Sequence, residues 1–132
     1  MRAIITLALL VLIAEIPAQT IKSIDDLKPV KAFDNIYVQN IETDSLSTTF
    51  IIWVKLKVKM HKHLNHIENV YIIEGIGEFT VSDSTYEVKK GDLIVIPKDT
   101  WHGLKVSSEK PMKVISIQSP EFKGTDRIFK EQ

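Results

Sequence analysis

Three histidines and one glutamate in this sequence have the residue types and spacing of a metal site. His61 and His63 lie two positions apart, Glu68 follows five residues later, and His102 stands much further along the chain. Residues two apart in a β-strand face the same side, so His61 and His63 can both point at one ion. Three neutral imidazoles and one carboxylate suit a divalent Fe, Mn, Ni, Cu or Zn ion. Four such ligands on an octahedral ion leave two positions for water, dioxygen or a substrate.

Other interpretations of these residues stay open at this point. His61 and His63 could be exposed polar residues of a hairpin, because a histidine pair alone does not define a metal site. His66, the fourth histidine, matches no ligand position, and we expect it to face solvent from a loop. A barrel that has kept its fold and lost its ion is the remaining alternative.

Charge and cysteine content exclude several classes of function. The 132 residues include 17 basic and 17 acidic side chains, which gives a formal net charge of +0. No overall field attracts nucleic acid or an anionic membrane, and the expected partner is a small-molecule ligand or substrate. The chain has no cysteine, which excludes disulfides, thiolate ligands and a cysteine nucleophile.

The first 18 residues have the layout of a secretory signal peptide. Arg2 supplies a positive start, residues 3–14 are apolar except for Thr6, and Ala18 offers a small residue for cleavage before Gln19. The apolar run is shorter than the roughly 20 residues that span a bilayer, so no retained membrane anchor is expected. The sequence therefore predicts a periplasmic or secreted protein that begins at Gln19.

The segments after this leader are predicted to be almost entirely β-structure. Residues 20–31 could form a short helix, with Ser23 as its N-cap and Pro29 as its end, or an extended arm. Alternating apolar residues and turn residues then mark about eight short strands. We expect these strands at residues 35–41, 48–60, 69–73, 79–81, 85–88, 93–96, 100–106 and 112–118. This spacing favours an all-β antiparallel sandwich or barrel over a parallel sheet with helices.

The two histidine segments resemble the two sequence motifs of the cupins. His61, His63, Glu68 and Gly75 follow the first motif, and the segment from Gly91 through Pro97 to His102 follows the second. The resemblance covers residues 48–118. It implies a double-stranded β-helix, or jelly-roll barrel, with a metal near one mouth. The resemblance further implies that His61, His63, Glu68 and His102 are the metal ligands. Residues 19–47 would then form an N-terminal arm and first strand, and residues 119–132 a tail that packs on the barrel.

Three positions depart from the motifs. Lys55 and Asp99 replace glycines, and Val106 replaces an asparagine. Asp99 is a mild change, because aspartate tolerates a left-handed turn conformation. If the strand were regular from Trp53 to His63, both histidines would lie on the same face as Lys55, Lys57 and Lys59. We therefore expect a β-bulge near residues 58–60, although the lysines could instead ring a wet barrel mouth.

The resemblance leaves the activity undecided. The best hypothesis is a metal-dependent enzyme, of the dioxygenase, decarboxylase, isomerase or lyase type, acting on a small polar or carboxylate-bearing molecule. The alternative is a non-catalytic module that binds a metal or ligand outside the cytoplasm. A homodimer is a third possibility, with residues 48–54 as its interface. Ser116 and Gln118 could line the cavity or face solvent, and Tyr71 is expected to be a packing residue.

Overall fold

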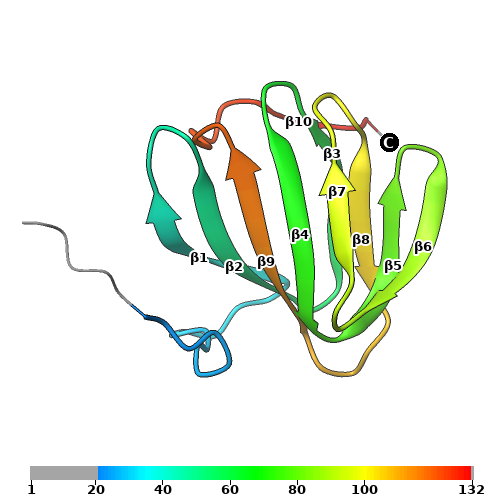
Figure 1. The fold of residues 1–132 in the computed structure, drawn as a ribbon. Coiled ribbons are helices and arrows are strands. Elements are labelled where there is room, and N and C mark those ends of the chain that lie inside the picture. Colours follow the sequence, from blue (N-terminus) through cyan, green and yellow to red (C-terminus); the bar gives the residue numbers. More distant parts are fainter. Residues whose placement is uncertain (1–20, 132) are drawn as a thin grey trace, which may run out of the picture.

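Ten antiparallel strands form two five-stranded sheets in a computed structural model that describes residues 21–131 (Figure 1). The strands are β1 (Ile36–Thr43), β2 (Thr48–Val54), β3 (Lys57–His63), β4 (Ile67–Glu74), β5 (Ile76–Val81), β6 (Ser84–Lys89), β7 (Leu93–Ile96), β8 (His102–Val106), β9 (Met112–Ser119) and β10 (Arg127–Phe129). One sheet has the order β1-β2-β9-β4-β7, and the other has the order β10-β3-β8-β5-β6. The all-β jelly-roll prediction is confirmed. The predicted signal peptide lies outside the described residues.

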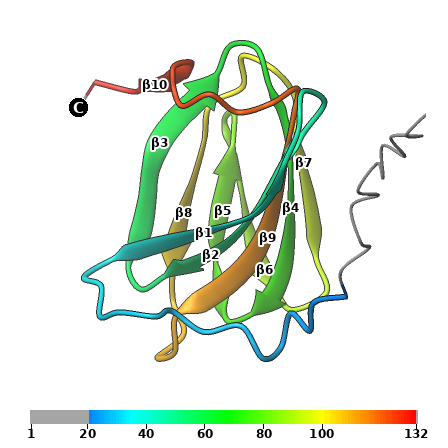
Figure 2. The same cartoon turned by 90° about the vertical axis from the view of Figure 1, so that its left-hand side faces the viewer.

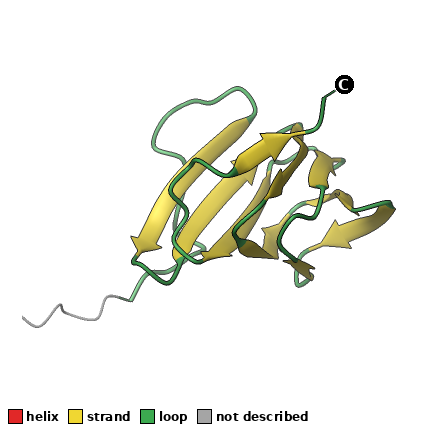
Figure 3. Ribbon diagram, turned by 90° about the horizontal axis from the view of Figure 1, so that it is seen from above, coloured by secondary structure: helices red, strands yellow, loops and turns green. Residues whose placement is uncertain are grey.

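The core lies between the two sheets. Its buried side chains come from both layers: Val54, Val70, Ile72, Phe79, Val88, Ile96, Leu104, Met112 and Val114. The apolar residues on the inner faces of the two sheets interdigitate, because this packing removes their side chains from water. Figure 3 looks onto the end of this arrangement from above and shows only strands and loops over the described residues. No helix long and apolar enough to cross a membrane occurs among residues 21–131.

A second, smaller cluster covers the other face of β2. Ile51 and Trp53 pack there with Ile73 and with residues of the N-terminal arm, such as Leu27 and Phe33. The predicted helix is wrong, because residues 24–26 form only a turn within an extended arm. This arm explains why both faces of β2 are covered in the single chain. The predicted dimer interface at residues 48–54 is therefore occupied by the chain's own arm, and β2 itself lies between β1 and β9.

The long apolar run at residues 48–60 is divided into two strands that belong to different sheets. Asn35 stabilises the break: its side-chain oxygen accepts hydrogen bonds from the backbone amides of Leu56 (2.9 Å) and Lys57 (3.0 Å). Its amide group also donates to the carbonyl of Lys57 at 2.8 Å. This break and the extra strand β10 account for ten strands where about eight were expected. Alternation continues across the break, so the sequence pattern alone did not mark it.

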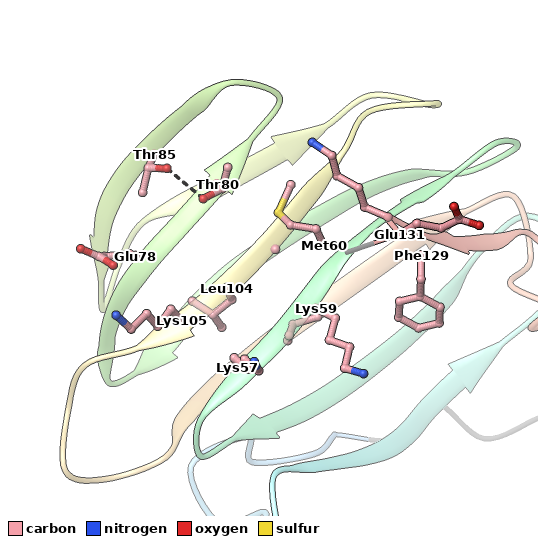
Figure 4. A pocket seen from close by; sticks show the side chains of 13 residues that line it. Lys57, Lys59, Met60, Glu78, Thr80, Thr85, Leu104, Lys105, Phe129 and Glu131 are labelled. Carbon is pink, nitrogen blue, oxygen red and sulfur yellow. Dashed lines mark hydrogen bonds between the residues drawn. The ribbon is translucent and has the colours of Figure 1, made fainter.

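The predicted β-bulge is present in β3. Val58 pairs with Leu104 and His61 pairs with His102, so the two residues Lys59 and Met60 on β3 oppose the single residue Gly103 on β8. The extra residue changes which side chains face the barrel interior. His61 and His63 are buried, whereas Lys57 and Lys59 are exposed. These two lysines line a surface groove of about 710 Å³ that Met60 also lines, and none of the four predicted ligands borders it (Figure 4).

Turn residues have the backbone conformations that the motifs require. Gly75 and Gly91 have φ angles of 92° and 97°, in the range that favours glycine. Asp99, which replaces a motif glycine, has a φ of 55°, so the expectation of a left-handed aspartate is confirmed. Gly75 has a further constraint, because a Cβ atom there would lie 2.8 Å from the Cα of Met112.

Candidate metal centre

The four predicted ligands meet at one end of the barrel, although they come from both sheets. His61 and His63 end β3, His102 begins β8, and Glu68 extends from β4 in the opposite sheet. Figures 1 and 2 show the loop between β3 and β4 and strand β10 at this end. All four side chains are buried, and one potential ligand atom from each lies within 4.8 Å of the others. The bulge in β3 and the register of β8 therefore produce the juxtaposition that the spacing predicted.

Two backbone carbonyls determine which nitrogen of the imidazoles faces the centre. Nδ1 of His61 lies 2.8 Å from the carbonyl of Lys59, and Nδ1 of His102 lies 2.9 Å from the carbonyl of Thr100. A carbonyl only accepts hydrogen bonds, so each Nδ1 carries a proton. In the neutral ring Nε2 then keeps its lone pair, which is the state that binds a metal.

Glu68 lies opposite these rings. Its Oε2 is 3.2 Å from Nε2 of His102 and 3.6 Å from Nε2 of His63. Its other oxygen, Oε1, accepts hydrogen bonds from the Ser116 hydroxyl and from Nε2 of Gln118, the latter at 3.3 Å. Ser116 and Gln118 thus line the interior and orient the carboxylate.

The electrostatics of the site favour the neutral form of His61 and His63 and the charged form of the carboxylate. Burial lowers the pKa of His61 to about 4, and the nearby His102 adds to this effect. Burial also lowers the pKa of His63. Burial would raise the pKa of Glu68, but the neighbouring His102 ring and the hydrogen bond from Ser116 outweigh it and lower that pKa to about 2. Neutral imidazoles and an ionised carboxylate are the protonation states that a metal ion requires.

Two ring nitrogens without hydrogen-bond partners in the described part of the chain also indicate that these residues fit a metal ion. Nε2 of His63 and Nε2 of His102 are buried, and neither has a hydrogen-bond partner within the described part of the chain. Buried polar atoms are normally satisfied, so an unpaired ring nitrogen facing a carboxylate calls for a positive charge between them. A divalent ion bound between the rings and the carboxylate can supply that charge.

A small cavity opens next to the four side chains. Its volume is about 90 Å³, and it is bordered by His61, Glu68 and His102 among the predicted ligands. Polar groups beyond the ligands also border it: Ser116, Gln118 and Arg127. The apolar part of the wall includes Val70 and Phe79. The arrangement places a potential ion at the wall of a space that can hold a small molecule.

The structure contradicts the expectation for His66. Its side chain is only 6% exposed, because the tail after β9 covers the loop between β3 and β4. There His66 contacts the carboxylate of Asp126, and its Nε2 donates to the carbonyl of Glu121 at 2.7 Å. Asp126 and Arg127 were missed by the sequence analysis, since no spacing relates a polar tail to the histidines. Tyr71 is 42% exposed on the outer face of β4, so it does not pack in the core.

Comparison with known proteins agrees with the fold and the motifs. The family model described as Cupin domain matches residues 49–118, more than half of the sequence. The chain belongs to the cupin family.

Individual relatives cover different shares of the chain. A protein of Methanocaldococcus jannaschii is 37% identical over 76 residues, which are 58% of this chain and 61% of that relative. An L-ectoine synthase of Aliivibrio fischeri is 30% identical over 89 residues, 65% of this chain and 70% of the enzyme. The chain thus spans less than two thirds of the first of these relatives. A conserved Klebsiella pneumoniae protein with a double-stranded β-helix domain superposes with a TM-score of 0.73 at 17% identity, over 87% of this chain and 100% of that one.

Proposed function

We propose that this cupin binds one divalent transition-metal ion through His61, His63, Glu68 and His102 and is an enzyme for a small anionic molecule. The observation that carries the proposal is the pair of buried Nε2 atoms of His63 and His102, which face the Glu68 carboxylate and have no hydrogen-bond partner among residues 21–131. Nitrogen and oxygen donors of this kind suit Fe, Mn, Ni, Cu or Zn. Such an ion, when bound, supplies Lewis-acid activation of a substrate oxygen or of dioxygen.

The residues around the ion position support catalysis rather than simple storage of a metal. Ser116 and Gln118 hold one oxygen of Glu68, so the carboxylate has a fixed direction toward the cavity. The cavity is bordered by polar groups that are not ligands, as expected of a site that must orient a second molecule. The similarity to an L-ectoine synthase also supports action on a small molecule.

Arg127 indicates the charge of that molecule. It borders the same cavity as His61 and Glu68, and its guanidinium lies 5.2 Å from the centre of the Phe122 ring. Within the described residues it forms no salt bridge. A guanidinium held by stacking and not neutralised by an acid is suited to a carboxylate, which it can bind with two parallel hydrogen bonds.

Metal binding is tested by elemental analysis of the full chain purified from its native compartment. We expect one equivalent of a transition metal, and its loss in the double variant His61→Ala/His102→Ala with the β-sheet circular dichroism retained. Lys105→Ala, on the outer groove, is the control and should keep the metal. A wild-type chain without stoichiometric metal, or a double variant that retains it, would refute the ligand assignment.

The anionic substrate class is tested with two probes of nearly equal shape, acetate and acetamide. Acetate should bind the metal-loaded chain more tightly than acetamide, and Arg127→Gln should remove that preference. Lys130→Gln changes an equal charge on the outer groove and should have no effect. Equal binding of the two probes by the wild type would contradict the proposal. A chain that binds metal and acetate but shows no turnover in a screen of small carboxylic acids would instead be a non-catalytic binding module.

The proposal includes an extracytoplasmic location, which rests on the leader-like sequence of residues 1–18. Cell fractionation followed by intact-mass analysis tests it. We expect the mature chain to begin at Gln19 in the periplasmic or extracellular fraction. Full-length protein found only in the cytoplasm would refute this location.

A further inference from the structure

The ring of His63 lies between two carboxylates. On one side its Nε2 is 3.6 Å from Oε2 of Glu68, and on the other its Nδ1 is 3.4 Å from Oδ1 of Asp126. His63 is 2% exposed and Asp126 is 7% exposed. Unlike His61 and His102, His63 has no backbone carbonyl of the described residues within hydrogen-bond distance of its Nδ1. Asp126 occupies the place that the carbonyls of Lys59 and Thr100 take for the other two rings.

Asp126 is itself fixed by neighbours on the loop between β3 and β4. Its Oδ2 accepts a hydrogen bond from the backbone amide of Asn65 at 3.0 Å and contacts Nδ1 of His66. Nε2 of His66 donates to the carbonyl of Glu121, which fixes the orientation of this ring beside Asp126. One carboxylate oxygen is thereby used for anchoring, and Oδ1 is directed at His63.

We propose that Asp126 is a positioning residue that accepts a hydrogen bond from Nδ1 of His63 and thereby holds Nε2 of that ring toward the metal position. The inference rests on the proposed function, since it concerns the same centre. A carboxylate behind a ligand histidine fixes the tautomer, restricts ring rotation and makes Nε2 a stronger donor. His66 acts one step further out, by orienting Asp126.

The packing of the tail supports this role. The Phe122 ring lies 5.6 Å from the His63 ring and 5.5 Å from the His66 ring, which fills the space beside both. The backbone amide of Phe122 donates to the Thr48 hydroxyl at 3.0 Å, and β10 pairs Arg127 with His63 in the sheet. The tail therefore has attachments to the barrel besides those of the Asp126 carboxylate.

A second metal ion among His63, His66 and Asp126 is the rival explanation, because these three side chains also lie close together. The donors disfavour it. Nε2 of His66 is used by the Glu121 carbonyl, and a second ion would require His63 to bind metals through both nitrogens after losing its last ring proton. The hydrogen-bonded arrangement needs neither change.

The test compares Zn²⁺ binding by the full wild-type chain with binding by Asp126→Asn and Asp126→Ala, measured by competition with a chelator. Loss of an outer carboxylate should weaken Zn²⁺ binding by about 10- to 100-fold, with alanine at the upper end. Two controls accompany them. Asp83→Asn makes the same chemical change in an exposed turn, and Thr48→Val removes a tail contact without touching His63. Both should keep the wild-type affinity.

A spectroscopic measurement separates positioning from tail docking. Long-range ¹H–¹⁵N spectra should show the proton of His63 on Nδ1 in the metal-free and in the Zn²⁺-loaded wild type. In Asp126→Ala this proton should exchange faster with water, whereas in Thr48→Val it should not. The metal-free spectrum needs no ion, so it tests the hydrogen bond even if the chain binds no Zn²⁺. A failure to bind Zn²⁺ would refute the proposed function and would leave this test of the hydrogen bond intact.

Four results would overturn the inference. The first is an Asp126→Ala chain with wild-type Zn²⁺ affinity, and the second is a His63 proton on Nε2 in the metal-free protein. The third is an equal loss of affinity in Thr48→Val, which would show that the docked tail matters and the carboxylate does not. The fourth is two equivalents of Zn²⁺ in the wild type with one lost in Asp126→Asn, which would establish the second metal site.

Discussion

Nε2 of His102 lies 3.2 Å from Oε2 of Glu68, although His102 is on β8 of one sheet and Glu68 is on β4 of the other. The candidate metal centre is therefore a contact between the two layers of the barrel. An ion bound there would connect strands that share no backbone hydrogen bonds. Stability and metal occupancy should consequently change together.

Removal of the metal should lower the unfolding temperature. An ion that binds only the folded chain stabilises it by about 2.7 kcal/mol at a free concentration 100 times its Kd, which corresponds to a shift on the order of 10 °C for a domain of this size. Thermal unfolding with Zn²⁺ and after addition of excess chelator measures the shift. The double variant His61→Ala/His102→Ala serves as the control, because its unfolding temperature should not respond to Zn²⁺.

Substitution Glu68→Gln should weaken Zn²⁺ binding by at least about 100-fold, the upper end of the cost of losing an outer partner, because the proposed function makes Glu68 a direct ligand. The amide has nearly the same shape as the carboxylate, and its oxygen can still accept the hydrogen bond from the Ser116 hydroxyl. The barrel should therefore remain folded. Chelator competition gives the affinity, and circular dichroism checks the fold. Near-normal affinity in Glu68→Gln would remove Glu68 from the ligand set.

Acid should destabilise the metal-free protein in two stages. The folded-state pKa of His61 is lowered from 6.5 to about 4, so the unfolded chain binds the extra proton first and stability falls between pH 6.5 and 4. The size of this loss is on the order of 3 kcal/mol. The pKa of Glu68 is lowered from 4.5 to about 2, so its contribution is present above pH 4.5 and is lost as the pH falls toward 2.

Urea unfolding of chelator-treated protein at pH 7.5, 6, 5 and 4 measures the first stage. His61→Gln has no titrating group at this position and should show a flatter dependence of the unfolding free energy on pH. If the unfolding free energy of the wild type and of His61→Gln changed equally with pH, protonation of His61 would not be the cause of the first stage.

Gly75→Ala and Gly91→Ala form a matched pair for the turns. Both residues have φ angles near 95°, and placing an alanine in such a left-handed conformation costs about 1–2 kcal/mol. The new Cβ at residue 91 meets no atom within 4 Å, whereas at residue 75 it lies 2.6 Å from Cγ of Met112. Overpacking should add about 1–3 kcal/mol to the destabilisation by Gly75→Ala alone. Equal unfolding free energies for the two variants would show that the chain around Met112 relaxes without cost.

Much of the barrel could be predicted from the sequence because local patterns mark it. Strands and turns are determined by patterns that extend over only a few residues. The bulge is also determined locally, by the lysines between Trp53 and His63. The break after Val54 was missed, because it depends on Asn35, which reaches the turn from a distant segment. The missing helix has a similar cause, since Leu27 and Phe33 of the arm pack on the barrel and favour an extended path.

The same distinction applies to the site. The four predicted ligands belong to short motifs with fixed spacing, and the structure brings them together. Ser116 and Gln118 could not be assigned a direction until the register of β9 against β4 placed Gln118 opposite Glu68. The expectation that His66 faces solvent was wrong, because the docked tail buries this side chain and no local pattern predicts where the tail docks. No sequence pattern marked Asp126 and Arg127, because the composition of a polar tail does not predict where the tail packs on the barrel.

The position of the tail has a consequence for how such proteins diverge. Asp126 lies behind a predicted ligand and Arg127 borders the cavity, yet both fall outside residues 49–118, the part that matches the family. The residues proposed to bind the ion lie within the family part, whereas Asp126, proposed to position His63, and Arg127, proposed to bind the anion, lie in the tail. Changes after β9 should therefore alter the proposed anion contact while leaving the barrel and its histidines intact. Exchanging these final residues between related barrels is accordingly a direct way to look for new specificities.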